Sequence, residues 1–181
     1  MALLKIAKLG HPAIRAGADI VNAGKCASQG FQSFLEDMVE TMRDADGVGL
    51  AAPQVHVAQR AIVLEVDPLN PRYPEYPNIS LTILINPKIV EHSSETQDDW
   101  EGCLSVPDLR ARVPRWRRIS VEAIDRNGGT IEFHAEGFFA RVLQHEIDHL
   151  DGKVFLDRVS DLSTLTHLRE YQQYWVKMMV E

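Results

Sequence analysis

The strongest constraint on the fold is a run of residues that contains two histidines four positions apart. Apolar side chains recur at spacings of three and four between positions 138 and 150, which predicts an amphipathic helix. Within it, residues 144–150 read QHEIDHL and contain the pattern His-Glu-x-x-His. Because residues i and i+4 share one face of a helix, His145 and His149 can hold one metal ion. Glu146 can then reach the open side of that ion as a proton carrier.

A catalytic metal site needs a third protein ligand and one open position for water. A helix with two ordinary histidines matches the same short pattern, so the third ligand decides between the two interpretations. The chain contains two cysteines, Cys26 and Cys103, and we expect both to be reduced thiols. Cys103 follows an acidic loop, where it could be a thiolate ligand, a nucleophile or a small core residue.

Length and charge narrow the class of protein. A chain of 181 residues fits a single domain, 1–181, with a substantial core. The net charge of −7 argues against a general nucleic-acid-binding surface. No run approaches the ~20 apolar residues of a membrane span, and the N-terminus does not resemble a signal peptide. We therefore expect a cytoplasmic protein, with an organelle location after removal of a transit peptide as the alternative.

The remaining elements mix helix and strand patterns. Residues 31–42 predict a long amphipathic helix, and the apolar residues from position 162 onwards predict a C-terminal helix. Strands are predicted at 60–66, 81–85, 89–91 and 154–156, and a hairpin joins 119–123 to 131–135. Residues 6–21 predict an irregular segment and residues 68–77 a loop. Five arginines form a basic cluster that we expect to lie mostly on a solvated strand edge: Arg110, Arg112, Arg115, Arg117 and Arg118.

A glycine-rich stretch, residues 47–54 (GVGLAAPQ), precedes the first predicted strand. It lacks the Lys-Ser/Thr pair of a phosphate-binding loop. Small residues allow close approach of the backbone to a ligand, and Gln54 adds an amide that can donate a hydrogen bond. A tight buried connection into the strand is the competing interpretation.

Three segments together resemble the signature motifs of the peptide deformylases. They are residues 47–54 (GVGLAAPQ), 101–105 (EGCLS) and 144–150 (QHEIDHL), and they stand in the order found in that family. The resemblance extends over nearly the whole chain and implies an α+β fold. In it, antiparallel or mixed β-sheets pack around a central metal-binding helix, with an N-terminal amphipathic helix and a C-terminal helix.

The resemblance also implies a reaction. Cys103, His145 and His149 would hold one divalent metal ion, with water in the fourth position. The enzyme would remove the N-formyl group from the initiator methionine of new polypeptides and release formate. Glu146 would act as general base and then acid. The Gln54 side chain and the Leu104 backbone N–H would stabilise the oxyanion.

The identity of the metal and the partners follow from the same resemblance. The donor set alone favours zinc, whereas the resemblance implies Fe²⁺ in the cell, with Zn²⁺, Ni²⁺ or Co²⁺ in a purified sample. N-formylmethionyl peptides would be the substrates, and the C-terminal helix would contact the ribosome. We expect neither a membrane nor a specific nucleic-acid sequence as a partner.

The substrate methionine would enter a pocket lined by Val48, Phe138 and Val142. Gly49 would hydrogen-bond the peptide backbone in the manner of an added strand, and Arg110 would lie near the rim. One departure from the family pattern is His56, where a glycine often stands. Because His56 has a Cβ, we expect that the backbone there does not need a glycine-only conformation.

Two further classes of protein compete with this interpretation. A zincin-type protease usually takes its third ligand downstream of the helix. In this chain, His167 is the only histidine downstream of residues 144–150. A structural zinc site is closed by four protein ligands, so Cys26 or another residue would have to join the other three.

Overall fold

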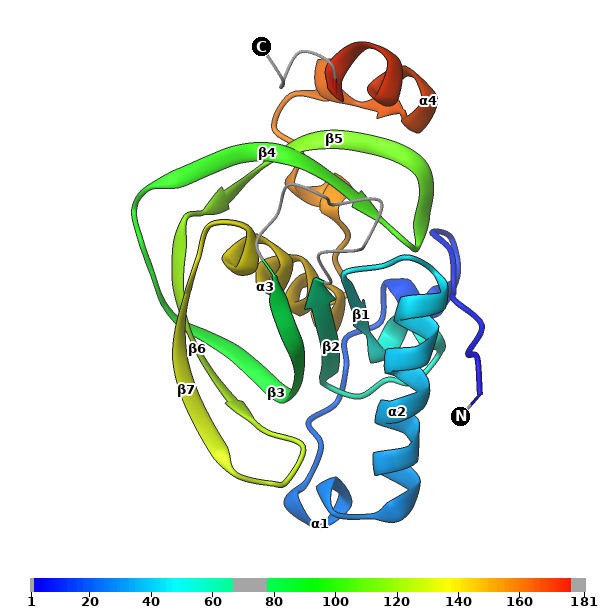
Figure 1. Ribbon diagram of the computed structural model, residues 1–181, viewed down its shortest axis with the longest axis vertical. Coiled ribbons are helices and arrows are strands. Elements are labelled where there is room, and N and C mark those ends of the chain that lie inside the picture. The colour runs from blue at the N-terminus through cyan, green and yellow to red at the C-terminus, as the bar shows by residue number, and fades with distance from the viewer. Residues whose placement is uncertain (1, 67–77, 177–181) are drawn as a thin grey trace.

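The computed structural model describes residues 2–66 and 78–176, so the predicted loop 68–77 lies outside the described residues. Within the described ranges, two antiparallel sheets form the framework (Figure 1). The first sheet has the strand order β1 (Gly49–Ala51), β2 (Ala61–Val66), β3 (Ile79–His92), β6 (Arg118–Ile124) and β7 (Thr130–Glu136). The second has the order β4 (Thr96–Cys103), β5 (Val106–Trp116) and β8 (Thr166–His167).

Helix α3 (Gly137–Leu150) lies between these sheets and contacts strands of both, among them β1, β2, β5 and β7. It is the predicted His-Glu-x-x-His helix, and all residues from Ala140 to Leu150 are buried. Gly152 ends it with a φ of +70°, as a left-handed C-terminal cap requires. This central helix between antiparallel sheets confirms the predicted α+β fold.

Helix α2 (Gln29–Asp44) confirms the predicted N-terminal amphipathic helix. Ser28 caps it, because the Ser28 hydroxyl accepts a hydrogen bond from the Phe31 backbone N–H. Its apolar stripe is buried and packs on β2: Phe31, Leu35, Met38, Val39 and Met42. Strand β2 is therefore covered by α2 on one face and by α3 on the other.

The predicted hairpin is also present. Strands β6 and β7 pair in register from Arg118 with Glu136 to Ile124 with Thr130. The turn is held by Asp125, whose carboxylate accepts hydrogen bonds from the backbone N–H groups of Asn127 and Gly129, both at 2.8 Å. Because β7 runs directly into α3, this hairpin sets where the histidine helix begins.

An irregular N-terminal strap, defined here as residues 7–18, crosses the molecule, as the sequence predicted. The Ala7 N–H donates to the Gln54 carbonyl at 2.7 Å, and the Leu9 N–H to the Ser105 carbonyl at 2.7 Å. The Ala18 N–H donates to the Leu150 carbonyl at 2.8 Å. The strap thus joins the three motif segments, which are far apart in sequence.

Two strand predictions differ from the structure. Strand β3 runs unbroken from Ile79 to His92, with a shift of register near Pro87 where Asn86 takes a left-handed φ of +53°. The Asn-Pro pair makes a bulge rather than a chain break. Residues 154–156 form no strand, because Phe155–Arg158 is a 3-10 helix, η3, held by the Asp157 carboxylate on the Val154 N–H.

The C-terminal helix begins later than predicted. Its expected start, Leu162–Thr164, is a 3-10 turn, η4, and β8 then pairs with β5 through Leu109–His167 and Arg110–Thr166. Only then does the chain enter α4 (Leu168–Glu170) and a π-helical turn, η5 (Tyr171–Trp175). The rest of the predicted helix, residues 177–181, lies outside the described residues.

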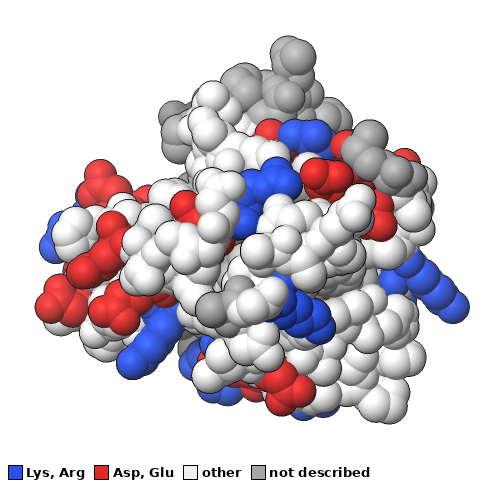
Figure 2. Space-filling model, turned by 90° about the horizontal axis from the view of Figure 1, so that it is seen from below, with Lys and Arg blue, Asp and Glu red and all other residues white. Residues whose placement is uncertain are grey.

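The basic cluster divides between surface and interior. Arg112, Arg117 and Arg118 are exposed, as predicted, but Arg110 and Arg115 are only 8% and 5% exposed. On the face drawn in Figure 2, basic side chains are interspersed with acidic ones. No helix in the described part of the chain has the length and apolar character to cross a membrane.

Candidate metal centre

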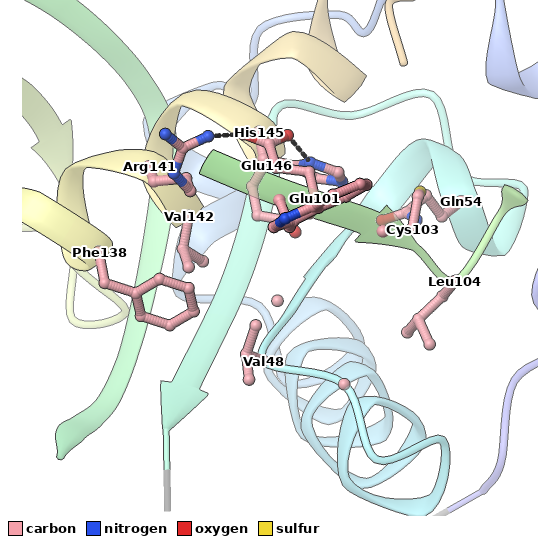
Figure 3. Close-up of a pocket in the computed structure, with 14 residues that line it drawn as sticks. Val48, Gln54, Glu101, Cys103, Leu104, Phe138, Arg141, Val142, His145 and Glu146 are labelled. Carbon is pink, nitrogen blue, oxygen red and sulfur yellow. Dashed lines mark hydrogen bonds and ion pairs between the residues drawn. The ribbon is translucent and has the colours of Figure 1, made fainter. Parts of the chain in front are cut away.

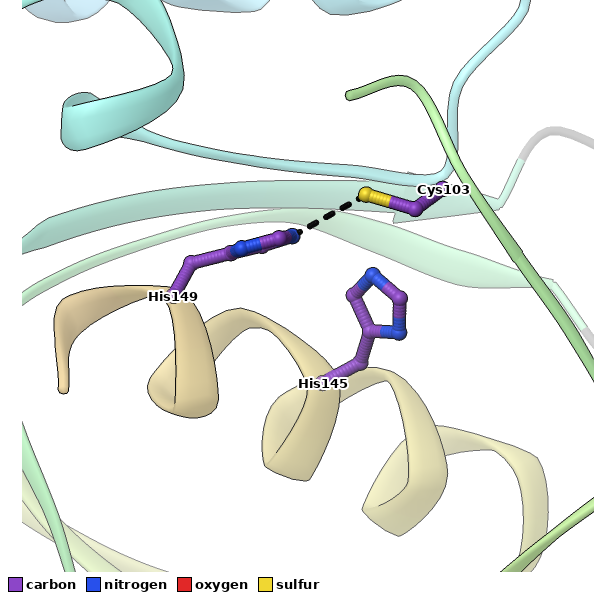
Figure 4. A group of neighbouring side chains, drawn as sticks. All are labelled: Cys103, His145 and His149. Carbon is purple, nitrogen blue, oxygen red and sulfur yellow. Dashed lines mark hydrogen bonds between the residues drawn. The ribbon is translucent and has the colours of Figure 1, made fainter. Parts of the chain in front are cut away.

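Three potential metal ligands meet at the centre of the molecule (Figure 4). One ligand atom from each of Cys103, His145 and His149 lies within 4.8 Å of the others, and all three residues are buried. The Cys103 Sγ is 3.2 Å from the His149 Nε2. This cluster contains soft thiolate and imidazole donors, the set that binds zinc, iron and similar transition metals.

The elements explain how these side chains meet. The histidines stand one turn apart on α3, and Cys103 ends β4 just before the chain turns into β5. The Cys103 sulfur accepts a hydrogen bond from the Ser105 backbone N–H at 3.3 Å and faces the Gln54 amide at 3.7 Å. These donors favour the thiolate form, which is the form that ligates metals.

Cys26 and His167, the remaining candidates for a third or fourth ligand, lie elsewhere. Cys26 is buried in the cluster of apolar residues around α2, and its Sγ contacts the Asn22 carbonyl at 3.7 Å. His167 is exposed on β8. Neither belongs to the metal-ligating group that the described residues form. The geometry therefore favours three protein ligands over a closed structural site or a downstream protease ligand.

A buried carboxylate, Glu101, orients His145. Its Oε2 accepts a hydrogen bond from the His145 Nδ1 at 2.9 Å, which leaves the His145 Nε2 to face the cluster. Arg115 holds the same carboxylate through two bonds of 2.9 and 3.0 Å, and Arg141 adds one of 2.8 Å. Such carboxylate–histidine pairs fix the ring orientation of metal ligands.

The network continues behind α3. Arg115 also contacts Asp148, which lies on α3 between the two histidines. Asp148 in turn binds Arg158 of η3 at 2.6 Å. The sequence patterns assigned no role to Glu101, Arg115, Arg141 or Asp148, and they placed most of the arginine cluster at the surface. The position of Glu101 two residues before the cysteine was the available signal.

Glu146 lies beside the cluster and lines the adjoining pocket. It is only 4% exposed, and its Oε2 has no hydrogen-bond partner among the described residues. Gly49 makes room for it, because a Cβ at Gly49 would stand 2.7 Å from the Glu146 carboxyl carbon. Here the glycine-rich stretch brings the backbone of β1 against the proposed proton carrier.

Gln54 and Leu104 flank the cysteine. The Gln54 Oε1 accepts the Ala51 backbone N–H at 2.8 Å, and its Nε2 donates to the Ser105 hydroxyl at 3.1 Å. Leu104 stands in the turn between β4 and β5, and its side chain lines the same pocket as Gln54. The Lys8 amine of the N-terminal strap binds the Leu104 carbonyl at 2.8 Å.

A pocket opens next to the cluster (Figure 3). Its apolar wall includes Val48, Phe138 and Val142, the residues expected to receive the methionine side chain. Arg110, expected near the rim, is not among the lining residues, and its guanidinium fills the space over Gly102 that a side chain would occupy. Trp100 and Arg141 line the pocket instead, and neither was expected.

Burial and charge set the protonation of these groups. Burial opposes the Cys103 thiolate, but the charge of His149 and hydrogen bonds from both histidines lower the pKa of this thiol well below its usual value. Burial likewise opposes ionisation of Glu101, but Arg115 and His145 lower its pKa. At Glu146 burial prevails over the charges of the two histidines and raises the pKa to about 7.

His56, in the turn after the glycine-rich stretch, has a left-handed backbone that is open to residues with a Cβ but favours glycine. It caps the 3-10 helix η2 (Ala52–Val55) with a φ of +66°, in the left-handed region. The backbone there needs the glycine-like conformation even though the residue has a Cβ, at a cost of roughly 1–2 kcal/mol. The His56 ring packs edge-on against the ring of His11 in the N-terminal strap, with 4.6 Å between the ring centroids.

A buried Cys-His-His group beside a pocket, with the Glu146 Oε2 unpartnered among the described residues, is the arrangement expected of a metal-dependent hydrolase. Comparison with known proteins agrees. The family model for polypeptide deformylase matches residues 3–164, so the chain belongs to the polypeptide deformylase family. It is therefore an enzyme that removes the N-formyl group from new polypeptides, which confirms the function predicted from the sequence.

Individual relatives show the same likeness. Peptide deformylase 2 of Nostoc sp. is 46% identical over 176 residues, which cover 97% of this chain and 96% of the relative. A class I type b peptide deformylase from Acinetobacter baumannii superposes with a TM-score of 0.85 at 39% identity, covering 88% of this chain and 100% of that one. The Thermotoga maritima enzyme gives a TM-score of 0.78 at 38% identity, covering 89% and 100%.

Proposed function

We propose that Cys103, His145 and His149 hold one divalent metal ion and that Glu146 carries the protons in hydrolysis of the formyl group. The observation that supports this most directly is the buried Glu146 Oε2, which has no partner among the described residues and belongs to the pocket beside the cluster. When bound, the ion polarises the formyl oxygen and lowers the pKa of a water toward ~7.

Glu146 takes a proton from the attacking water and delivers it to the departing amine. In the metal-free protein, burial raises the pKa of this carboxyl above its usual value, which favours its taking up a proton. The Gln54 amide and the Leu104 backbone N–H donate to the oxyanion that forms on the formyl group. Removing one such donor typically lowers kcat ~10²–10³-fold.

The apolar wall of Val48, Phe138 and Val142 receives the methionine side chain, and the backbone of Gly49 binds the peptide as an added strand would. The deformylase from Acinetobacter baumannii has been solved with the peptide Met-Ala-Ser bound, which supports a methionine-first peptide as the ligand of this site. N-formylmethionyl peptides are accordingly the proposed substrates.

The Glu146→Gln variant tests the role of Glu146. The amide has the same shape but cannot take up the proton, so we expect a loss of formyl hydrolysis of ~10²-fold or more with an unchanged metal content. Formate release from formyl-Met-Ala-Ser and metal analysis of the same sample measure the two effects. Normal turnover by this variant would remove Glu146 from the mechanism.

We propose Fe²⁺ as the metal in the cell. A donor set of one thiolate and two imidazoles suits several divalent ions, so the assignment needs a direct comparison. A chelator should abolish activity, and anaerobic reloading with Fe²⁺ should restore more of it than Zn²⁺ does, with Ni²⁺ and Co²⁺ as working substitutes. Equal activity of the zinc and iron forms would contradict the assignment of iron.

We propose that the enzyme works in the cytoplasm, where bacterial formylated chains emerge, and that its C-terminal segment contacts the ribosome. Large apolar side chains of this segment are exposed, including Leu162 at 71% and Tyr174 at 55%. Cosedimentation with ribosomes, compared between the full chain and a chain lacking residues 162–181, tests this contact.

A further inference from the structure

Lys8 of the N-terminal strap reaches the turn that carries the cysteine of the metal cluster. Its Nζ donates to the Leu104 carbonyl oxygen at 2.8 Å, although the two residues are 96 positions apart. Cys103 pairs with Val106 where β4 meets β5, so Leu104 and Ser105 are the two residues of a tight hairpin turn. Within the described ranges, no carboxylate lies at ion-pair distance from Lys8, and its charge is therefore available to this carbonyl.

The peptide group between Leu104 and Ser105 has one partner at each end. Its carbonyl oxygen accepts from Lys8, and its N–H donates to the Cys103 Sγ at 3.3 Å. Ser105 is fully buried, so water does not compete for this N–H. The peptide group is the central one of the turn, and turn types I and II differ in how that central group is rotated. The Lys8 contact therefore fixes the rotation that points the N–H at the sulfur.

The Lys8 ammonium also polarises this peptide group. A cation on the carbonyl oxygen draws electrons away from the N–H, and hydrogen bonds in series strengthen one another in this way. The stronger bond to the sulfur withdraws negative charge from the thiolate. A thiolate that donates less charge leaves a bound metal ion a stronger Lewis acid, as hydrogen bonds to metal ligands do in other sites.

We propose that Lys8 is a positioning residue for formyl hydrolysis: through the Leu104–Ser105 peptide group it orients and polarises the hydrogen bond on the Cys103 sulfur. This rests on the proposed function, in which Cys103 is a ligand of the metal ion. Lys8 itself is exposed and does not line the substrate pocket. Its loss should therefore slow the chemical step and leave the binding of the formyl peptide unchanged.

The experiment compares Lys8→Met, which removes the charge, with Lys8→Arg, which keeps it, in enzyme loaded with Co²⁺. For formyl-Met-Ala-Ser, we expect kcat of Lys8→Met to fall about tenfold at unchanged KM, the lower end of the range for groups that support metal ligands. The thiolate-to-cobalt absorption band should move to longer wavelength, because the sulfur then holds its electrons less tightly. Lys8→Arg should bring both readouts back towards the wild type.

Lys5→Met is the matched control. Lys5 is also exposed near the N-terminus, but it makes no hydrogen bond or ion pair with another described residue. Its kcat and its absorption band should equal those of the wild type.

An unchanged kcat and an unchanged band in Lys8→Met would overturn the proposal. Equal losses in Lys8→Met and Lys8→Arg would also overturn it, because the charge would then make no difference. A lower Tm of Lys8→Met without a change in kcat or in the band would show a purely structural contact, which refutes the proposal as well. If the wild type itself shows no thiolate-to-cobalt band, Cys103 is not a ligand, and that distinct result refutes the proposed function.

Discussion

The Glu101→Gln substitution probes the buried network that orients His145. Gln has nearly the same shape but no charge, while Arg115 and Arg141 keep theirs in an interior where Glu101 makes four bonds of 2.8 to 3.0 Å. Removing one partner of a buried ion pair costs about 3–5 kcal/mol. Because the amide still accepts some of these bonds, we expect a loss near the lower end, about 3 kcal/mol.

Two measurements separate stability from metal binding. In metal-free protein, a loss of about 3 kcal/mol corresponds to a Tm lower by roughly 6–12 °C for a chain of this size. Competition with a chelator should show metal affinity ~10–100-fold weaker, because His145 loses the carboxylate that fixes its ring. Glu95→Gln is the control: Glu95 also pairs with an arginine, Arg117 at 2.7 Å, but at the surface, so its Tm should stay close to wild type.

The pH dependence gives a third readout with a fixed sign. The arginines lower the pKa values of Glu101 and Asp148, so the stabilisation from these carboxylates is present above their unfolded pKa, near ~4. It is lost as the pH falls through the lower pKa values of the folded protein. Glu101→Gln removes one of these groups, and its stability should fall less steeply on acidification than that of the wild type.

The prediction is wrong if Glu101→Gln melts within the error of the wild type and binds metal equally well. Such a result would mean that the charges of Arg115 and Arg141 are satisfied without Glu101. A Tm loss equal in Glu101→Gln and Glu95→Gln would also refute it, because burial would then make no difference to the ion pair.

Two glycine substitutions should separate activity from stability. Gly49→Ala places a methyl group against the movable Glu146 side chain, so kcat should fall by ~10²-fold with little change in Tm; full activity would contradict the contact. Gly152→Ala places it 2.5 Å from the Arg15 carbonyl oxygen at a φ of +70°, so unfolding should become easier by at least ~1–2 kcal/mol while the metal site still works. Thermal melting and formate release, measured on both variants, test these two predictions. An unchanged Tm in Gly152→Ala would contradict the predicted backbone strain at residue 152.

The sequence predicted the elements whose periodicity is local. Helices α2 and α3 and the β6–β7 hairpin each have a repeating apolar pattern or a strong turn signal, and all three are present. The predicted start of the C-terminal helix was wrong. The spacing of Leu162 and Leu165 is helical, but both side chains are exposed and no α-helix begins there. Pairing of β8 with β5, a contact distant in sequence, overrides the local pattern.

The candidate site shows the same limit. The three potential ligands were identified because the motifs name them, and the structure brings them together. Arg115 looked like one of several surface arginines, and only the fold shows that it is buried against Glu101 and Asp148. The left-handed backbone of His56 was missed for a related reason, since the conformation is set by the helix end rather than by the residue.

The N-terminal strap has a consequence for when the enzyme becomes active. It is synthesised before the segments that it binds, because its hydrogen bonds reach Gln54, Ser105 and, last, Leu150. Pairings over such long sequence separations form late and slowly during folding. Most of the polypeptide must therefore emerge from the ribosome before the strap can bind all three motif segments. We expect a partly synthesised chain to have no activity.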